Sequence, residues 1–217
     1  MIIEKLDYLL EKNYLVGDEK YFRASVAIPL IYKDGEEHFL FEKRAAEIRQ
    51  GGEVSLPGGE CDNDEKDSSL TAIRETSEEL GISREKIQHL GKYGSLITPF
   101  GALIDVHIVQ LLIQNMNEID YDHSEVESVF TLPVKYFIEN EPKVFYAKSQ
   151  VIPSYFDSEG NLIELFPAKK FNLPEKYSKP WGTHKHRILV YETQPEIVWG
   201  ITAEIIYDFI NKLKGLL

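Results

Sequence analysis

The sequence predicts an α/β fold in which a mixed β-sheet is sandwiched between helices. Apolar and β-branched stretches typical of strands recur along most of the chain, and few segments show the helical spacing of apolar residues. Such a series of strands with scattered helices and mostly short connections is typical of a mixed sheet packed by helices. No linker, internal repeat or low-complexity tract divides the chain, so we predict one domain over residues 1–217.

The first part of the chain predicts a helix followed by a hairpin. Apolar residues at helical spacing indicate a short amphipathic helix over residues 3–13. Strands are expected over residues 22–32 and 38–42, because the Asp34-Gly35 pair between them is a hairpin signal. A polar loop over residues 44–50 then leads towards a glycine-rich turn.

The next helix has clear signals at both ends. Asp67 and Ser68 can cap its start, and Gly81 can end it after Leu80. The elements expected after it are strands over 87–98 and 103–113, a short helix over 134–138 that Pro133 begins, strand-like segments from 143 to 167, a strand over 187–192 and a closing helix over 201–213. Residues 169–185 are expected to form a long loop, so that the region near 143–185 is an added hairpin and loop.

The charge balance restricts the class of partner. The chain carries 36 acidic and 24 basic side chains, which gives a formal net charge of −12. Nucleic acid or an anionic membrane surface would need a clustered positive field, so neither is expected as a partner. A small anionic substrate is compatible with this charge if basic side chains gather locally. Homodimerisation is left open.

Cysteine content and the first residues indicate the compartment. Cys61 is the single cysteine, which excludes an internal disulfide framework and fits a reducing environment. The first residues show no signal-peptide pattern, and no apolar run approaches the roughly 18 residues of a membrane span. We therefore expect a cytoplasmic protein.

The helix that starts near Asp67 has two distinct faces at a helical period. Its expected core face consists of Leu70, Ile73, Ser77 and Leu80, and the other face carries Glu75, Glu78 and Glu79. Like charges at this spacing repel, and a hard divalent cation such as Mg²⁺ or Mn²⁺ would convert the repulsion into binding. A solvated acidic surface is the common alternative. The upstream turn Pro57-Gly58-Gly59, whose glycines let the backbone approach a ligand closely, favours a metal site.

The run from Gly59 to Ile82 resembles the Nudix box. That pattern is a glycine, a glutamate after five residues, then seven residues and Arg-Glu-U-x-Glu-Glu-x-Gly-U, where U is bulky and apolar. The residues that keep the pattern are Gly59, Glu65, Arg74-Glu75, Glu78-Glu79, Gly81 and Ile82. Eight residues rather than seven separate Glu65 from Arg74, and Thr76 stands where an apolar residue is usual.

The resemblance implies a Nudix fold and metal-dependent hydrolysis of a nucleoside diphosphate linked to another moiety. The metal ligands that it implies for Mg²⁺ or Mn²⁺ are Glu75, Glu78, Glu79 and the Gly59 carbonyl. The catalytic residues that it implies are Glu78, Glu75 and Arg74, with Arg74 orienting the carboxylates. The general base stays open between Glu78 and an acid outside the helix, such as Glu125 or Glu127.

Upstream residues are similar to the extra motif of the coenzyme A pyrophosphatase branch of this family. They are Arg44-Ala45, Arg49, Gly52 and Leu56-Pro57-Gly58-Gly59, and Trp199-Gly200-Ile201-Thr202-Ala203 resembles the start of the last helix in that branch. Departures from the branch pattern occur at Glu42, Gly51 and Leu56. The substrate-binding residues implied are Lys43, Arg44, Arg49 and Gly58, since arginine suits phosphate through its planar fork of donors. An ordinary exposed basic loop is the alternative.

The implied reaction is hydrolysis of coenzyme A, or a derivative, to 3′,5′-ADP and a 4′-phosphopantetheine product. Two other functions stay open. One is cleavage of a different nucleoside diphosphate such as ADP-ribose or a nucleotide sugar. The other is a catalytically silent Nudix fold that senses a ligand, although the intact Glu75, Glu78 and Glu79 weigh against it.

Overall fold

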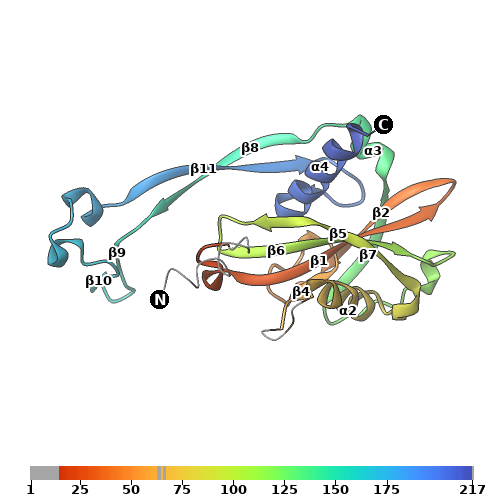
Figure 1. Cartoon of the computed structure of the whole chain (residues 1–217), viewed down its shortest axis with the longest axis horizontal. Helices are drawn as coiled ribbons and strands as arrows, with labels where there is room; N and C mark the ends of the chain where they lie inside the picture. The colour runs from red at the N-terminus through yellow and green to blue at the C-terminus, as the bar shows by residue number, and fades with distance from the viewer. Residues whose placement is uncertain (1–14, 63–64, 66, 217) are drawn as a thin grey trace, which may run out of the picture. The chain divides into compact units, whose positions relative to one another are not determined.

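The computed structural model describes residues 15–62, 65 and 67–216 (Figure 1). The chain divides into two compact units: unit 1 comprises Met1–Asn140 and Asp208–Leu217, and unit 2 comprises Glu141–Tyr207. The helix predicted over residues 3–13 lies outside the described residues. The single domain over residues 1–217 stays a prediction.

Unit 1 contains a mixed sheet, which confirms the predicted class. Within the described residues its seven strands are β1 (Phe22–Lys33), β2 (Glu36–Arg44), β3 (Val54–Ser55), β4 (Gly58–Glu60), β5 (Ile87–Ile97), β6 (Ala102–Leu111) and β7 (Val126–Pro133). The main path runs β3-β2-β1-β6-β5, while β4 pairs with β1 and β7 pairs with β2. β1 and β6 run parallel, and the other pairs are antiparallel.

The β1–β2 hairpin turns at the predicted pair, where Asp34 and Gly35 have φ values of 54° and 90°. β2 continues two residues beyond the predicted end, so Arg44 belongs to the strand and not to the polar loop. The reason is a pair of backbone bonds: Arg44 N donates to Glu53 O at 3.0 Å, and Gly52 N donates to Arg44 O at 2.9 Å. This pairing brings the loop back beside β2.

The helix α2 (Ser68–Leu80) has the predicted bounds. The Asp67 side chain accepts a hydrogen bond from Ser69 N, and Gly81 adopts the left-handed conformation at φ 60°. A side chain at Gly81 would also collide with the chain, since its Cβ would lie 1.8 Å from Asp120 O. Both helix ends therefore depend on the residues that predicted them.

The predicted core face of α2 is wrong in part. Leu70 is 58% exposed, whereas the residues of α2 that are buried are Ser69, Thr71, Ala72, Thr76, Glu79 and Leu80. The small Ala72 packs in one cluster with Ala27 of β1, which lets the helix lie close to the sheet. Thr76 can be buried because its hydroxyl donates to Ala72 O at 2.6 Å. The buried face of α2 is therefore rotated about the helix axis from the predicted one, and it includes Glu79.

Helices cover both faces of this sheet (Figure 1). On one face, α2 packs over the cluster that includes Leu40 and Val109. On the other face lie α3 (Val134–Glu139) and the part of α4 (Gly200–Lys214) that belongs to unit 1. The Phe39 ring makes edge contacts with Phe137 of α3 and with Phe209 of α4, with ring centres 5.5 Å and 5.8 Å apart. The predicted arrangement, a sheet between helices, is confirmed. No described helix is both long and apolar enough to cross a membrane.

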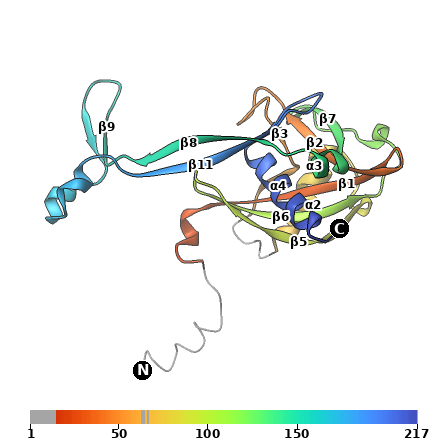
Figure 2. The same ribbon diagram turned by 90° about the horizontal axis from the view of Figure 1, so that it is seen from above.

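Unit 2 is built on a ribbon in which β8 (Lys143–Val151) pairs with β11 (Trp181–Tyr191), as Figure 2 shows. Its other elements are β9 (Ser154–Phe156), β10 (Leu162–Glu164), β12 (Val198–Trp199), the 3-10 turns η5 (Ala168–Phe171) and η6 (Glu175–Ser178), and the first part of α4. The prediction of a long loop over residues 169–185 is wrong at the C-terminal end of that range. β11 begins at Trp181 because it pairs with β8, a partner distant in sequence.

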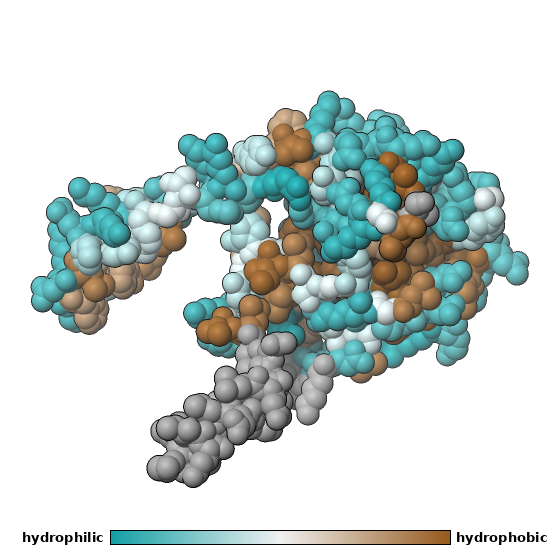
Figure 3. All heavy atoms as spheres, turned by 45° about the horizontal axis from the view of Figure 1, so that its top comes forward, coloured by the Kyte–Doolittle hydropathy of each residue, from teal (hydrophilic) through white to brown (hydrophobic). Residues whose placement is uncertain are grey.

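Several apolar side chains of unit 2 are exposed. Phe145 is 53% exposed, Tyr155 49% and Phe156 71%, so the ribbon and the β9–β10 hairpin do not bury them. In the space-filling view, brown apolar side chains gather at the end of unit 2 that carries the β9–β10 hairpin (Figure 3). These exposed fractions argue against a hairpin core built from the three aromatic side chains.

Candidate metal and diphosphate site

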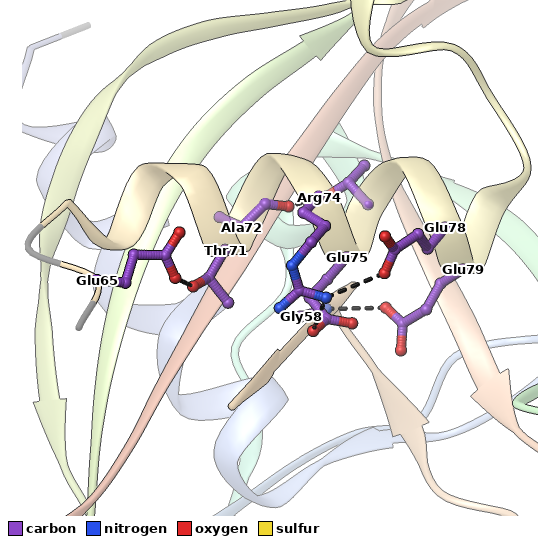
Figure 4. Close-up of polar contacts among 9 residues, drawn as sticks. Gly58, Glu65, Thr71, Ala72, Arg74, Glu75, Glu78 and Glu79 are labelled. Carbon is purple, nitrogen blue, oxygen red and sulfur yellow. Dashed lines mark hydrogen bonds and ion pairs between the residues drawn. The ribbon is translucent and has the colours of Figure 1, made fainter. Parts of the chain in front are cut away.

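Glu79 joins α2 to the glycine-rich turn. Its side chain is buried, and its Oε2 accepts a hydrogen bond of 2.9 Å from the backbone N–H of Gly58 (Figure 4). Gly58 opens β4, which pairs with β1, so this contact fixes the helix face against the edge of the sheet. The structure thus brings together the two motifs that the sequence placed side by side.

Arg74 lies between the other two acids of the helix. Its Nη1 is 2.8 Å from Oε1 of Glu75 and 3.0 Å from Oε2 of Glu78 (Figure 4). The Glu75 side chain is 15% exposed and that of Glu78 is 57% exposed. Arg74 therefore orients both carboxylates, with Glu75 on the buried side and Glu78 on the solvent side.

Gly59 forms a close backbone cradle for Glu75. A Cβ at Gly59 would lie 2.4 Å from Oε1 and 2.5 Å from Cδ of Glu75. Because Gly59 has no side chain, this carboxylate can reach the backbone beside it. A metal site whose ligands include both a carboxylate and a backbone carbonyl requires such a close approach.

A fourth carboxylate, which was not predicted as a site residue, is Glu42 of β2. It is 0% exposed, and its Oε1 accepts a hydrogen bond of 2.8 Å from Ser55 Oγ. Alternation along β2 puts Glu42 on the same face as Leu40, which packs against α2. The signal available in the sequence was an acid directly after the apolar run Phe39-Leu40-Phe41, at the end of a predicted strand.

Burial dominates the electrostatics of these acids. Burial and then the charge of Glu42 raise the pKa of Glu79 to about 9, although the bond from Gly58 opposes the shift. Burial also raises the pKa of Glu42 to about 7, and it raises the pKa of Glu75 against the opposing effect of Arg74. The site therefore disfavours the charged form of these three acids as long as no cation is bound.

The chemistry of this donor set fits a hard divalent cation. Carboxylate and carbonyl oxygens are the ligands that Mg²⁺ and Mn²⁺ prefer, and a cation would stabilise the charged form of Glu79 in place of its proton. Within the described residues, no three His, Cys, Asp or Glu side chains already converge as a ligand set. Arg74 holds Glu75 and Glu78, so these two carboxylates would turn from Arg74 to bind a cation.

The basic residues of the predicted substrate loop do not all lie on one face. Arg44 lies on the side of Glu42, with Nη1 3.9 Å from its Oε1, and its Nε donates to Arg49 O at 3.2 Å. Arg49 is exposed, with its guanidinium 6.0 Å from the centre of the Phe22 ring. Lys43 projects to the opposite face of β2, where its Nζ lies 3.1 Å from Oε1 of Glu127.

The other candidate acids are separated in the same way. The negative charge of Glu125 contributes to the raised pKa of Glu42 and of Glu75, so Glu125 belongs to the surroundings of the site. Glu127 pairs with Lys43 on the opposite face. Glu65 accepts a hydrogen bond from the Thr71 hydroxyl near the start of α2, at the other end of the helix from Glu79 (Figure 4).

Comparison with known proteins agrees with this geometry. The family described as the NUDIX domain matches residues 21–153, which include the whole site. The chain belongs to the Nudix family. The resemblance predicted from the run Gly59 to Ile82 is thereby confirmed, and so is the enzyme class, a Nudix hydrolase. Nudix hydrolases generally use divalent metals and act on small nucleoside diphosphate derivatives.

Three curated relatives illustrate the range of similarity. Nudix hydrolase 3 of Caenorhabditis elegans is 27% identical over 88% of this chain and 72% of its own length. The mitochondrial coenzyme A diphosphatase NUDT8 of Homo sapiens is 29% identical over 88% of this chain and 68% of its own length. The peroxisomal coenzyme A diphosphatase NUDT7 of Mus musculus is 31% identical over 58% of this chain. The matched region spans about half of that relative's length (52%).

Proposed function

We propose that this Nudix hydrolase cleaves the diphosphate bond of coenzyme A, or of its thioester derivatives, with Mg²⁺ or Mn²⁺ as the cofactor. The observation that carries the proposal is the carboxylate face of α2, joined through Glu79 to Gly58 and flanked by Arg44 at the end of β2 and by Arg49, whose backbone oxygen Arg44 contacts. The similarity to relatives named coenzyme A diphosphatases supports this choice of substrate.

The reaction is the addition of water to one phosphorus of the diphosphate. The new P–O bond forms as the bridging P–O bond breaks, and the products are 3′,5′-ADP and a 4′-phosphopantetheine product. A bound divalent cation would neutralise the diphosphate charge and activate the attacking water. The residues proposed to hold it are Glu75, Glu78, Glu79 and the Gly59 carbonyl.

The protein groups would have separate tasks. Arg74 keeps Glu75 and Glu78 oriented before the cation binds. Arg44 and Arg49 would bind phosphate oxygens of the substrate by charge-assisted hydrogen bonds. The proton of the attacking water would pass to a carboxylate, and the candidates on this side of the sheet are Glu78 and Glu125.

A substrate panel tests the proposal. Purified protein with Mg²⁺ or Mn²⁺ is incubated with coenzyme A, an acyl derivative, ADP-ribose and a nucleotide sugar, and the products are separated and identified. We expect 3′,5′-ADP from coenzyme A, and no product from the matched variant Glu79→Gln. Turnover of ADP-ribose or a nucleotide sugar with coenzyme A left intact would show that the substrate assignment is wrong. No turnover of any diphosphate would favour a ligand sensor.

A further inference from the structure

One oxygen of Glu42 has no hydrogen-bond partner among the described residues. The side chain is 0% exposed, and Ser55 Oγ hydrogen-bonds to Oε1, whereas Oε2 is buried without a hydrogen bond from any described residue. Arg44 Nη1 lies 3.9 Å from the other oxygen, Oε1. A buried polar atom left without a partner costs free energy, so this oxygen calls for a ligand or an explanation.

The position of Glu42 connects it with the carboxylates of α2. Ser55 holds Glu42, and three residues later Gly58 holds Glu79. The short segment from Ser55 to Gly58 therefore fixes the two buried carboxylates at its two ends. Glu42 also lies on the face of β2 that packs against α2, the helix that carries the buried Glu79.

A purely structural role for Glu42 accounts less well for these contacts. A carboxyl group that stays neutral carries a proton on one oxygen, and that O–H needs an acceptor when it is buried. A neutral Glu42 can place this proton on Oε1 and donate to the Ser55 hydroxyl, but Oε2 is then still a buried acceptor with no donor among the described residues. A cation between the two acids would satisfy Oε2 and would remove the repulsion at the same time.

We propose that Glu42 is a further ligand of the divalent cation at this site and binds it through Oε2, together with Glu79. The inference rests on the metal dependence in the proposed function and adds a ligand from β2, outside the helix. In the sequence, Glu42 stands out only as a departure from the coenzyme A branch pattern.

The test is Mn²⁺ binding, measured by calorimetry and by the electron paramagnetic resonance signal of free Mn²⁺. The variant is Glu42→Gln, which keeps the shape and removes the charge. The matched control is Glu37→Gln, an exposed acid on the same strand. We expect Glu42→Gln to weaken Mn²⁺ binding by about tenfold or more, and Glu37→Gln to change it by less than about twofold. Wild-type affinity in Glu42→Gln would overturn the inference.

A second variant and a second readout keep the test decisive. Glu42→Thr is also uncharged and is measured in the same way. Both variants relieve a buried repulsion, so in the absence of metal we expect them to unfold at or above the wild-type temperature, and to gain less stability than wild type when Mn²⁺ is added. A Mn²⁺-dependent gain equal to that of wild type in either variant would contradict the role of Glu42.

Failure of the substrate assignment and failure of this inference look different. A wild-type protein that binds Mn²⁺ but leaves coenzyme A intact would overturn the proposed substrate, while weak binding by Glu42→Gln would still support the ligand. Cleavage of coenzyme A by wild type, with unchanged Mn²⁺ affinity in Glu42→Gln, would overturn the ligand alone. A wild-type protein that binds no Mn²⁺ would overturn both.

Discussion

A Cβ at Gly59 would lie 2.4 Å from Oε1 of Glu75, which leaves no room for a side chain between the turn and the helix. The colliding atoms belong to the end of a side chain, so in Gly59→Ala the carboxylate is expected to move rather than the backbone. A displacement of about 1 Å can cost about 100-fold in rate, and we expect a loss of that order in kcat for coenzyme A.

The stability of the same variant separates displacement from unfolding. We expect Gly59→Ala to change the free energy of unfolding by less than about 1 kcal/mol, measured by urea denaturation. The matched control is Gly94→Ala in β5, where a Cβ would meet nothing within 4 Å. Normal turnover by Gly59→Ala, or an equal loss in Gly94→Ala, would contradict this explanation.

Arg74 uses one nitrogen, Nη1, for both of its carboxylate contacts. A lysine has a single charged nitrogen that can take its place, so Arg74→Lys is expected to keep more activity than Arg74→Ala. We expect Arg74→Ala to lose about 10- to 100-fold in kcat/KM, because Glu75 and Glu78 lose their common orienting group.

The effect of Arg74 on stability should be small. The Glu78 side chain is 57% exposed, and exposed ion pairs contribute about 0–1 kcal/mol. Lys135→Ala is a suitable control, since Lys135 also makes an i,i+4 ion pair, with Glu139 of α3. If Arg74→Lys were as inactive as Arg74→Ala, the planar fork rather than the single contact would be required.

How much of this site the sequence could predict depends on how local each signal is. The ends of α2 were predicted because Asp67 and Gly81 act on the adjacent turn. The buried side of α2 was not, because it follows from the close approach of Ala72 to Ala27, which are distant in sequence. The burial of Glu42 likewise depends on Ser55 in β3.

The same distinction applies to the rest of the fold. The turn at Asp34-Gly35 is a local signal and was predicted, whereas the start of β11 at Trp181 depends on pairing with β8. Lys43 and Arg44 are neighbours in sequence, and only the alternation of β2 shows that they point to opposite faces. Local sequence signals therefore predicted the family and the ends of α2. Pairing between segments distant in sequence decides which side chains meet.

Because the pKa values of its buried acids are raised, the metal-free protein is expected to become less stable as the pH rises. The pKa of Glu79 is raised to about 9 and that of Glu42 to about 7, from an ordinary value of 4.5. Between the ordinary and the raised values the folded state binds more protons than the unfolded state. Stability is thus greatest at and below the ordinary value and falls as the pH rises above it, until about 7 for Glu42 and about 9 for Glu79, by up to about 1.4 kcal/mol per pH unit for each proton.

The measurement is urea unfolding with a chelator across this range. Burial lowers the pKa of His38 and of His107 below 6.5, so these histidines oppose the trend only at lower pH, and the range above 6.5 reports the acids. Glu79→Gln is expected to flatten the slope. A stability that stays constant or rises from about pH 7 to 9 in the wild type would contradict the raised pKa of Glu79.

The two faces of β2 predict different effects of neighbouring basic residues on substrate binding. Arg49 is exposed beside the loop that Arg44 closes, so Arg49→Ala is expected to raise KM for coenzyme A by about tenfold with little change in stability, through loss of one charge-assisted contact. Lys43 faces away and contacts Glu127, and we expect Lys43→Ala to leave KM within about twofold.

Steady-state kinetics at two salt concentrations check this difference. The increase in KM caused by Arg49→Ala should shrink at high salt, since salt screens an exposed charge interaction. A phosphate-bearing fragment such as 3′,5′-ADP should bind Arg49→Ala less tightly than wild type, and it should bind Lys43→Ala normally. An equal increase in KM for both variants would mean that the whole basic run attracts the substrate through its net charge, regardless of which face of β2 each side chain occupies.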